Sequence, residues 1–109
     1  MTKITIFKKD DIIWSYQVKG HSGFAEEGRD IVCSAVSTAT QMTLVGLKEV
    51  LKLKVESIIE DGFLQVRLLD GDENNKDAQI LLNTMFLTLQ DIAKNYAKNV
   101  KMEVRKDVY

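Results

Sequence analysis

The apolar residues of this chain repeat with two different periods, and this change of period constrains the fold more than any other feature of the sequence. In five short stretches apolar and polar residues alternate, as in strands with one buried face: residues 3–7, 12–18, 54–60, 63–69 and 100–105. In two longer stretches the apolar residues recur every three or four positions, as on one side of a helix: residues 31–53 and 78–96. The stripe predicted for the first helix consists of Val32, Ala35, Val36, Ala39, Thr43, Gly46, Leu47 and Val50. The predicted order is strand, strand, helix, strand, strand, helix, strand.

The first two predicted strands, and likewise the third and fourth, are separated by a stretch short enough for a β-hairpin turn. Asp10-Asp11 interrupts the first pair, and Asp61-Gly62, which tolerates the positive φ angles of a type I′ turn, interrupts the second. Hairpins separated by single helices predict an α+β fold, a two-layer sandwich in ββαββαβ order with one mixed sheet and two helices on one face. Within the first helix, Gly46 predicts close packing against that sheet.

Length and composition predict one domain over residues 1–109, with a core that needs neither a disulfide nor a metal to fold. Hydrophobic residues make up 45% of the chain and proline is absent, which favours compact order over a flexible linker. Fifteen basic and sixteen acidic residues give a formal charge of -1, so we expect no direct nucleic-acid partner.

The same composition bears on the compartment. A single cysteine cannot form an intramolecular disulfide, and no basic-then-apolar segment precedes the first strand, so we expect a cytoplasmic protein. No apolar run approaches the roughly 18 residues that a membrane-spanning helix needs, and we therefore expect no membrane partner.

The residues suited to catalysis gather between the first hairpin and the first helix. The only histidine, His21, lies in a glycine-rich stretch, and the only cysteine, Cys33, lies near the predicted start of the helix. Cysteine attacks as a thiolate, and its ordinary pKa of about 8.5 leaves little thiolate near neutral pH. A helix N-terminus and a neighbouring imidazole both favour the thiolate, so this pair predicts Cys33 as a catalytic nucleophile and His21 as its base.

Four neighbouring residues are candidates for supporting roles. Asp30 has the residue type favoured at a helix N-cap, which would place Cys33 in the first turn, at the edge of the apolar stripe. Ser37 follows one turn later, where its hydroxyl could meet the thiol or the imidazole, or bond a backbone carbonyl. Gly20 and Gly23 let the backbone approach a ligand closely, and the amides of Gly23 and Cys33 are candidate oxyanion donors.

Plainer explanations exist for each residue, because a helical cysteine is often a small buried hydrophobe and glycine-rich loops are often only turns. Other chemistries fit the spacing less well. A phosphatase-type loop needs an arginine six positions after the cysteine, where this chain has Ala39. Two cysteine or histidine residues are too few for a structural zinc site, and the glycine spacing differs from the dinucleotide-binding GxGxxG pattern, so we predict neither a metal nor a cofactor.

The run GHSG, followed seven positions later by DIVCSAVS, resembles the family of ribosomal-processing cysteine proteases called Prp, and length and element order are similar over the whole chain. The resemblance implies an endopeptidase for ribosome maturation. Its substrate would be the precursor of large-subunit ribosomal protein L twenty-seven, losing an N-terminal extension by cleavage after an aromatic residue. The resemblance also implies a homodimer, a catalytic dyad of His21 and Cys33, and further motif positions at Gly20, Asp30 and Ser37.

Three points stay open at this stage. Ile80 and Leu87 fall opposite the core stripe of the second helix, either as a subunit contact or as scattered exposed residues. Asp30 either orients His21 or only caps the helix. The alternative to a protease is a non-enzymatic domain that binds a ribosomal protein or an assembly factor, and whose cysteine packs or senses oxidants.

Overall fold

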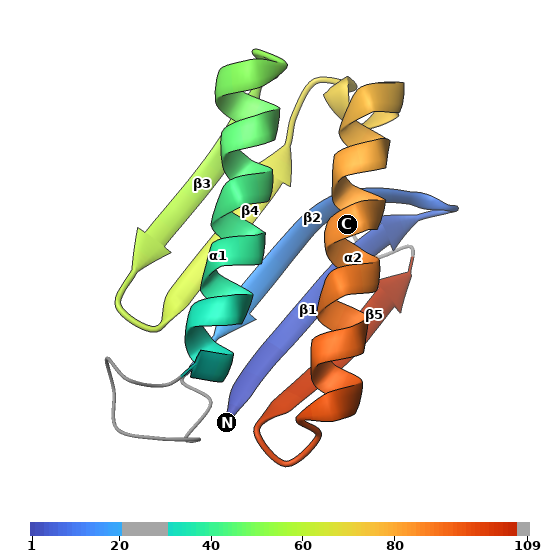
Figure 1. The fold of residues 1–109 in the computed structure, drawn as a ribbon. Coiled ribbons are helices and arrows are strands. Elements are labelled where there is room, and N and C mark those ends of the chain that lie inside the picture. The colour runs from blue at the N-terminus through green and yellow to red at the C-terminus, as the bar shows by residue number, and fades with distance from the viewer. Residues whose placement is uncertain (21–30, 107–109) are drawn as a thin grey trace.

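The computed structural model describes residues 1–20 and 31–106. Its elements follow the predicted order, as Figure 1 shows. Five strands and two long helices succeed one another: β1 (Thr2–Lys9), β2 (Ile12–Lys19), α1 (Ile31–Val45), β3 (Val55–Glu60), β4 (Phe63–Leu68), α2 (Lys76–Asn95) and β5 (Val100–Lys106). A π-helical turn (Gly46–Val50) extends α1, and a short 3₁₀ turn (Asp72–Asn74) precedes α2. The predicted ββαββαβ arrangement is confirmed.

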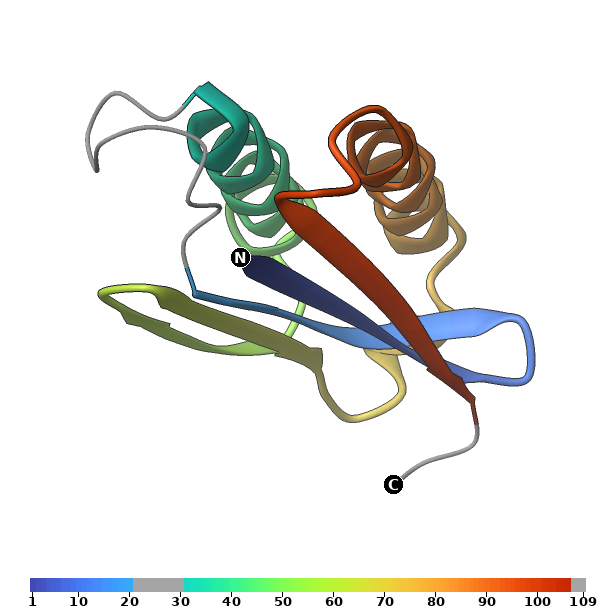
Figure 2. The ribbon, with the colours of Figure 1, turned by 90° about the horizontal axis from the view of Figure 1, so that it is seen from below.

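The strands form a single sheet in the order β3-β4-β2-β1-β5. β5 pairs parallel with β1, and the other neighbouring pairs are antiparallel, so the sheet is mixed. Both helices lie on the same side of this sheet, as the view from below shows (Figure 2). The two-layer α+β sandwich expected from the sequence is therefore confirmed.

The core fills the space between the sheet and the helices. Strand register explains which side chains reach it, because Ile4 pairs with Val18 and Val18 pairs with Leu64, which places all three on the helix-facing side. The largest fully buried side chains come from both layers: Ile4, Ile6, Ile13, Tyr16 and Val66 from the sheet, and Val32, Val36, Leu47, Leu82 and Leu89 from the helical layer. Burying each such side chain contributes roughly 1.5 to 3 kcal/mol.

The second half of α1 differs from its predicted pattern. The prediction placed Val50 on the buried stripe of a helix over residues 31–53, yet Val50 is 72% exposed and the helical turns end near Leu51. A π-helical turn takes more residues than an α-helical one, so a stripe projected at 100° per residue loses register after Val45. Ala35, also placed on the stripe, is exposed.

Gly46 permits close packing, but against the second helix rather than the sheet. A Cβ atom added at Gly46 would lie 2.7 Å from Cδ1 of Leu81 in α2, so the Leu81 side chain would have to shift to accommodate it. The expectation that this glycine packs on the sheet is wrong, because the position faces the neighbouring helix in the same layer.

The turn of the second hairpin also differs in detail from its prediction. Gly62 has a φ of +70°, whereas Asp61 is not among the residues with positive φ, so this is not the type I′ turn that we expected. In the first hairpin, Asp10 adopts the left-handed conformation with a φ of +57°.

α2 follows its predicted pattern closely. Asn75 caps its N-terminus, because the side-chain oxygen accepts a hydrogen bond from the Ala78 amide at 3.0 Å. Ile80 and Leu87 point away from the core and are 63% and 61% exposed. Within the described ranges, neither α2 nor any other helix combines the length and apolarity required to cross a membrane.

Candidate active site

Cys33 is the third residue of α1 and therefore lies in its first turn, as the sequence predicted. Its side chain is half-buried. The predicted partner of its sulfur, His21, lies outside the described residues, together with Asp30 and Gly23.

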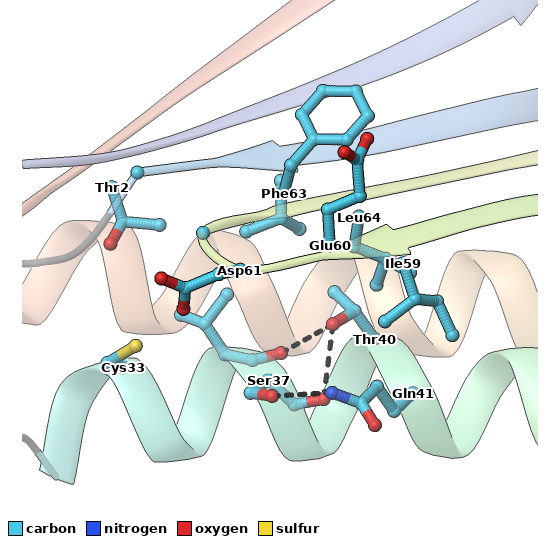
Figure 3. A pocket seen from close by; sticks show the side chains of 14 residues that line it. Thr2, Cys33, Ser37, Thr40, Gln41, Ile59, Glu60, Asp61, Phe63 and Leu64 are labelled. Carbon is cyan, nitrogen blue, oxygen red and sulfur yellow. Dashed lines mark hydrogen bonds between the residues drawn. The ribbon is translucent and has the colours of Figure 1, made fainter. Parts of the chain in front are cut away.

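A pocket of about 230 Å³ opens beside Cys33, as Figure 3 shows. It lies between the first turns of α1 and the turn that joins β3 to β4, and the start of β1 and the end of β2 complete it. Its lining is mixed in polarity: Val18, Val36, Ile59, Phe63 and Leu64 supply apolar atoms, and Thr2, Ser37, Thr40, Gln41, Glu60 and Asp61 supply polar groups, beside Gly20, Cys33 and Gly62. A cavity of this kind, next to a nucleophile, can hold one side chain of a substrate.

Gly20 is fixed at the edge of this pocket for a reason that the sequence pattern did not reveal. Its φ is +87°, and a Cβ atom there would lie 2.7 Å from the Met1 carbonyl oxygen, so only glycine fits. The Gly20 amide also donates a hydrogen bond of 2.7 Å to the Gly62 carbonyl. This bond ties the end of β2 to the β3–β4 turn and brings two walls of the pocket together.

Ser37 lies one turn beyond Cys33 and lines the same pocket. Its hydroxyl oxygen accepts a hydrogen bond from Nε2 of Gln41 at 2.8 Å. The Thr40 hydroxyl donates to the Val36 carbonyl at 2.9 Å, so that buried polar group is also paired. The structure therefore brings three predicted site residues, Gly20, Cys33 and Ser37, to one pocket.

Two further polar residues of the pocket were missed by the sequence analysis. Thr2 is only 1% exposed, and its hydroxyl oxygen has no hydrogen-bond partner in the described part of the chain. The Asp61 side chain points from the β3–β4 turn toward the Cys33 end of the pocket (Figure 3). In the sequence, Thr2 fits the alternating pattern of a strand and Asp61 fits a turn, so neither residue indicated a role in the site. Only the pairing of the strands reveals that they face Cys33.

Comparison with known proteins places this chain in a family. The family model described as cysteine protease Prp matches residues 1–101. The ribosomal processing cysteine protease Prp of Bacillus subtilis is 31% identical, and the match covers 94% of this chain and 96% of that protein.

Solved structures resemble the fold as well as the sequence. A crystal structure of the essential ribosomal processing protease Prp from Staphylococcus aureus, in complex with a covalently linked product peptide, superposes with a TM-score of 0.89 at 25% identity. Another, in complex with a substrate peptide, superposes with a TM-score of 0.83 at 25% identity. Each match covers 96% of this chain and 100% of the solved chain.

Proposed function

This chain belongs to the family of cysteine protease Prp, and from that premise we propose that it trims the precursor of large-subunit ribosomal protein L twenty-seven. It removes the N-terminal extension by cleaving after an aromatic residue, as a step of ribosome maturation in the cytoplasm. The observation that carries the proposal is the placement of Cys33 in the first turn of α1, beside a pocket large enough for a side chain. The peptide complexes named for the Staphylococcus aureus protein support a peptide as the substrate.

The proposed mechanism uses His21 and Cys33 as a dyad. His21 accepts the Cys33 proton, and the thiolate forms a bond to the carbonyl carbon of the scissile peptide, giving a tetrahedral intermediate. The amides of Gly23 and Cys33 stabilise the oxyanion of that intermediate. When the C–N bond breaks, His21 returns the proton to the leaving amine. A water molecule deprotonated by the same imidazole then hydrolyses the thioester and regenerates the thiol.

Three residues support the dyad in this proposal. Gly20 holds the chain next to the β3–β4 turn through its hydrogen bond to Gly62, which fixes the point from which residue 21 follows. Asp30 precedes the first residue of α1 and either orients His21 or caps the helix. Ser37 supports the pocket wall one turn beyond Cys33, where Gln41 already engages its hydroxyl.

The aromatic preference is consistent with the walls of the pocket. Val36 and Leu64 are buried beside it, and Val18 adds further apolar surface. Aromatic rings gain more from apolar burial than smaller side chains do. A volume of about 230 Å³ leaves room for one such ring.

We also propose that the protein acts as a homodimer through the outer face of α2. Ile80 and Leu87 are both more than half exposed on that face, and burying them against a second copy would remove apolar surface from water. The Ile80→Lys variant should shift the protein from dimer to monomer in sedimentation velocity. Gln90→Ala, an exposed change on the same helix, is the control. A wild-type protein that sediments as a monomer at micromolar concentration would refute the proposal.

The test of the protease activity is direct. Incubation with a peptide that spans the extension of the ribosomal protein should give two products whose masses locate the cut. Cys33→Ala and His21→Ala should lower cleavage by at least about 10³-fold, because each removes one member of a unit that acts together. Ser34→Ala, an exposed change in the same turn, should cleave like the wild type.

Two outcomes would contradict the proposed activity. If the Cys33→Ala protein cut at the wild-type rate, the thiol would not be the nucleophile. If the wild-type protein bound the peptide but released no product, a non-enzymatic binding or redox-sensing domain would be the better account.

A further inference from the structure

Two polar groups at the Cys33 end of the pocket make no side-chain hydrogen bond within residues 1–20 and 31–106. The Thr2 hydroxyl oxygen is buried and has no partner among these residues, although buried polar atoms in folded proteins are nearly always paired. Figure 3 shows this hydroxyl on the side of Thr2 that faces Cys33. Because the hydroxyl already lies on that side, it can form a hydrogen bond with a group that enters the pocket.

Asp61 is the second of these groups. Its carboxylate is exposed, and in the described part of the chain no hydrogen bond or ion pair connects it to another residue. Two carboxylates of the sheet are matched with cations: Glu56 lies 3.5 Å from Arg67, and Glu103 lies 3.0 Å from Arg105. Asp61, like Glu60 at the end of β3, has no such cation among the residues that the structure describes, and it lies beside the pocket that holds the thiol.

The neighbouring carboxylate does not share this position. Glu60 lines the pocket, but Figure 3 shows its side chain directed away from α1, whereas the Asp61 side chain points toward the Cys33 end. Among the residues that the structure describes, no group of three or more histidine, cysteine and acidic residues gathers to hold a metal ion. One carboxylate and one hydroxyl instead match the hydrogen-bonding needs of a single ammonium or guanidinium group.

We propose that Thr2 and Asp61 form a subsite for a lysine or arginine side chain of the peptide substrate, close to the bond that Cys33 attacks. The cationic group donates hydrogen bonds to the Asp61 carboxylate and the Thr2 hydroxyl at the Cys33 end of the pocket, beside the space assigned to the aromatic ring. This inference rests on the proposed function, because it concerns the substrate of the same site. It adds a requirement for positive charge beside the aromatic residue.

The experiment compares two sets of peptides that differ in one side chain. Each set carries lysine at a single position within three residues of the scissile bond, or norleucine, which keeps the stem and removes the charge. For the position that occupies the subsite, kcat/KM of the wild type should be about tenfold higher with lysine, as for one charge-assisted contact. Asp61→Asn should bring that ratio close to one.

Matched variants separate recognition from folding and catalysis. Thr2→Val should reduce the lysine preference and Thr2→Ser should restore it, because serine keeps the hydroxyl. Glu56→Gln, on β3 but paired with Arg67, should leave the preference unchanged. Thermal unfolding of each variant identifies any loss of fold. Raising the salt concentration should shrink the lysine preference of the wild type, because this contact is partly exposed.

Binding to the Cys33→Ala protein tests the subsite without cleavage. The lysine peptide should bind about tenfold more tightly than the norleucine peptide, and Asp61→Asn should remove the difference. Equal affinity for both peptides at every position would overturn the subsite even if the wild type cleaves them. A lysine preference in binding with no cleavage by the wild type would instead overturn the proposed function. If Asp61→Asn slowed both peptides equally, Asp61 would be a positioning residue for catalysis rather than part of a subsite.

Discussion

The two helices pack on the same face of one sheet, yet they bury different kinds of residue. The described buried positions of α2 are all apolar: Ala78, Leu82, Met85 and Leu89. α1 buries Thr40 and Thr43 beside its apolar residues. Both threonine hydroxyls donate to carbonyls four residues earlier in the helix, which satisfies them locally. α2 is therefore a packing element, whereas α1 combines packing with one wall of a pocket.

The helix ends show the same contrast. Asn75, the residue directly before α2, caps the N-terminus of that helix. α1 instead places Cys33 in its first turn and ends in a π-helical turn, and the sheet holds it by a buried hydrogen bond of 2.7 Å from the Tyr16 hydroxyl to the Thr40 carbonyl. Changes in α2 should therefore affect stability, and changes in the first turn of α1 should affect the reaction.

The largest effect that tests this contrast is expected at Leu82. Its side chain is fully buried, so Leu82→Ala should lower the free energy of unfolding by about 2 to 5 kcal/mol through lost burial and a cavity. The protein that remains folded should cleave peptide normally, because Leu82 does not line the pocket. Urea unfolding and cleavage below the unfolding transition measure the two quantities.

Cys33→Ala is the opposite case and serves as the comparison. It should abolish cleavage while changing the free energy of unfolding by less than about 1 kcal/mol, because the side chain is small and only partly buried. A Cys33→Ala protein destabilised as strongly as Leu82→Ala would remove the distinction between the two helices.

The two helices also differ in how well the sequence predicted them. The stripe of α2 repeats without interruption from Ala78 to Ala93, so a regular helix projects it correctly. The stripe of α1 was projected through the same geometry, and the π-helical turn displaced Val50 from the core. The prediction chose the sheet as the packing partner of Gly46, because the apolar pattern of one helix does not specify which element packs against it. Periodicity predicts elements and faces, but a local change of helix type lies outside it.

The sequence predicted the position of a site residue only where its neighbours along the chain determine that position. Cys33 falls in the first turn because a few neighbouring residues determine where the helix starts. Thr2 and Asp61 are 59 positions apart, and they share a pocket because β2 pairs with both β1 and β4. That proximity depends on strand order, which hydrophobic alternation does not specify. The proposed subsite could therefore be seen only in the folded protein.

The smallest effect expected here concerns the link between the sheet and α1. Tyr16→Phe removes the hydrogen bond to Thr40 and should cost about 1 kcal/mol at neutral pH. Burial raises the pKa of the Tyr16 phenol well above its ordinary value of about 10, since the charged form would lose its hydration. The unfolded chain therefore releases this proton at a lower pH than the folded protein.

The sign of the pH dependence follows from that difference. The contribution of Tyr16 to stability is fully present below about pH 10 and is lost as the pH rises further, because ionisation then favours the unfolded state. Urea unfolding at pH 8 and pH 11 should show the stability advantage of the wild type over Tyr16→Phe shrinking at the higher pH. An advantage that grew with pH would mean that the phenol is not held neutral by burial, and α1 would then be attached to the sheet in some other way.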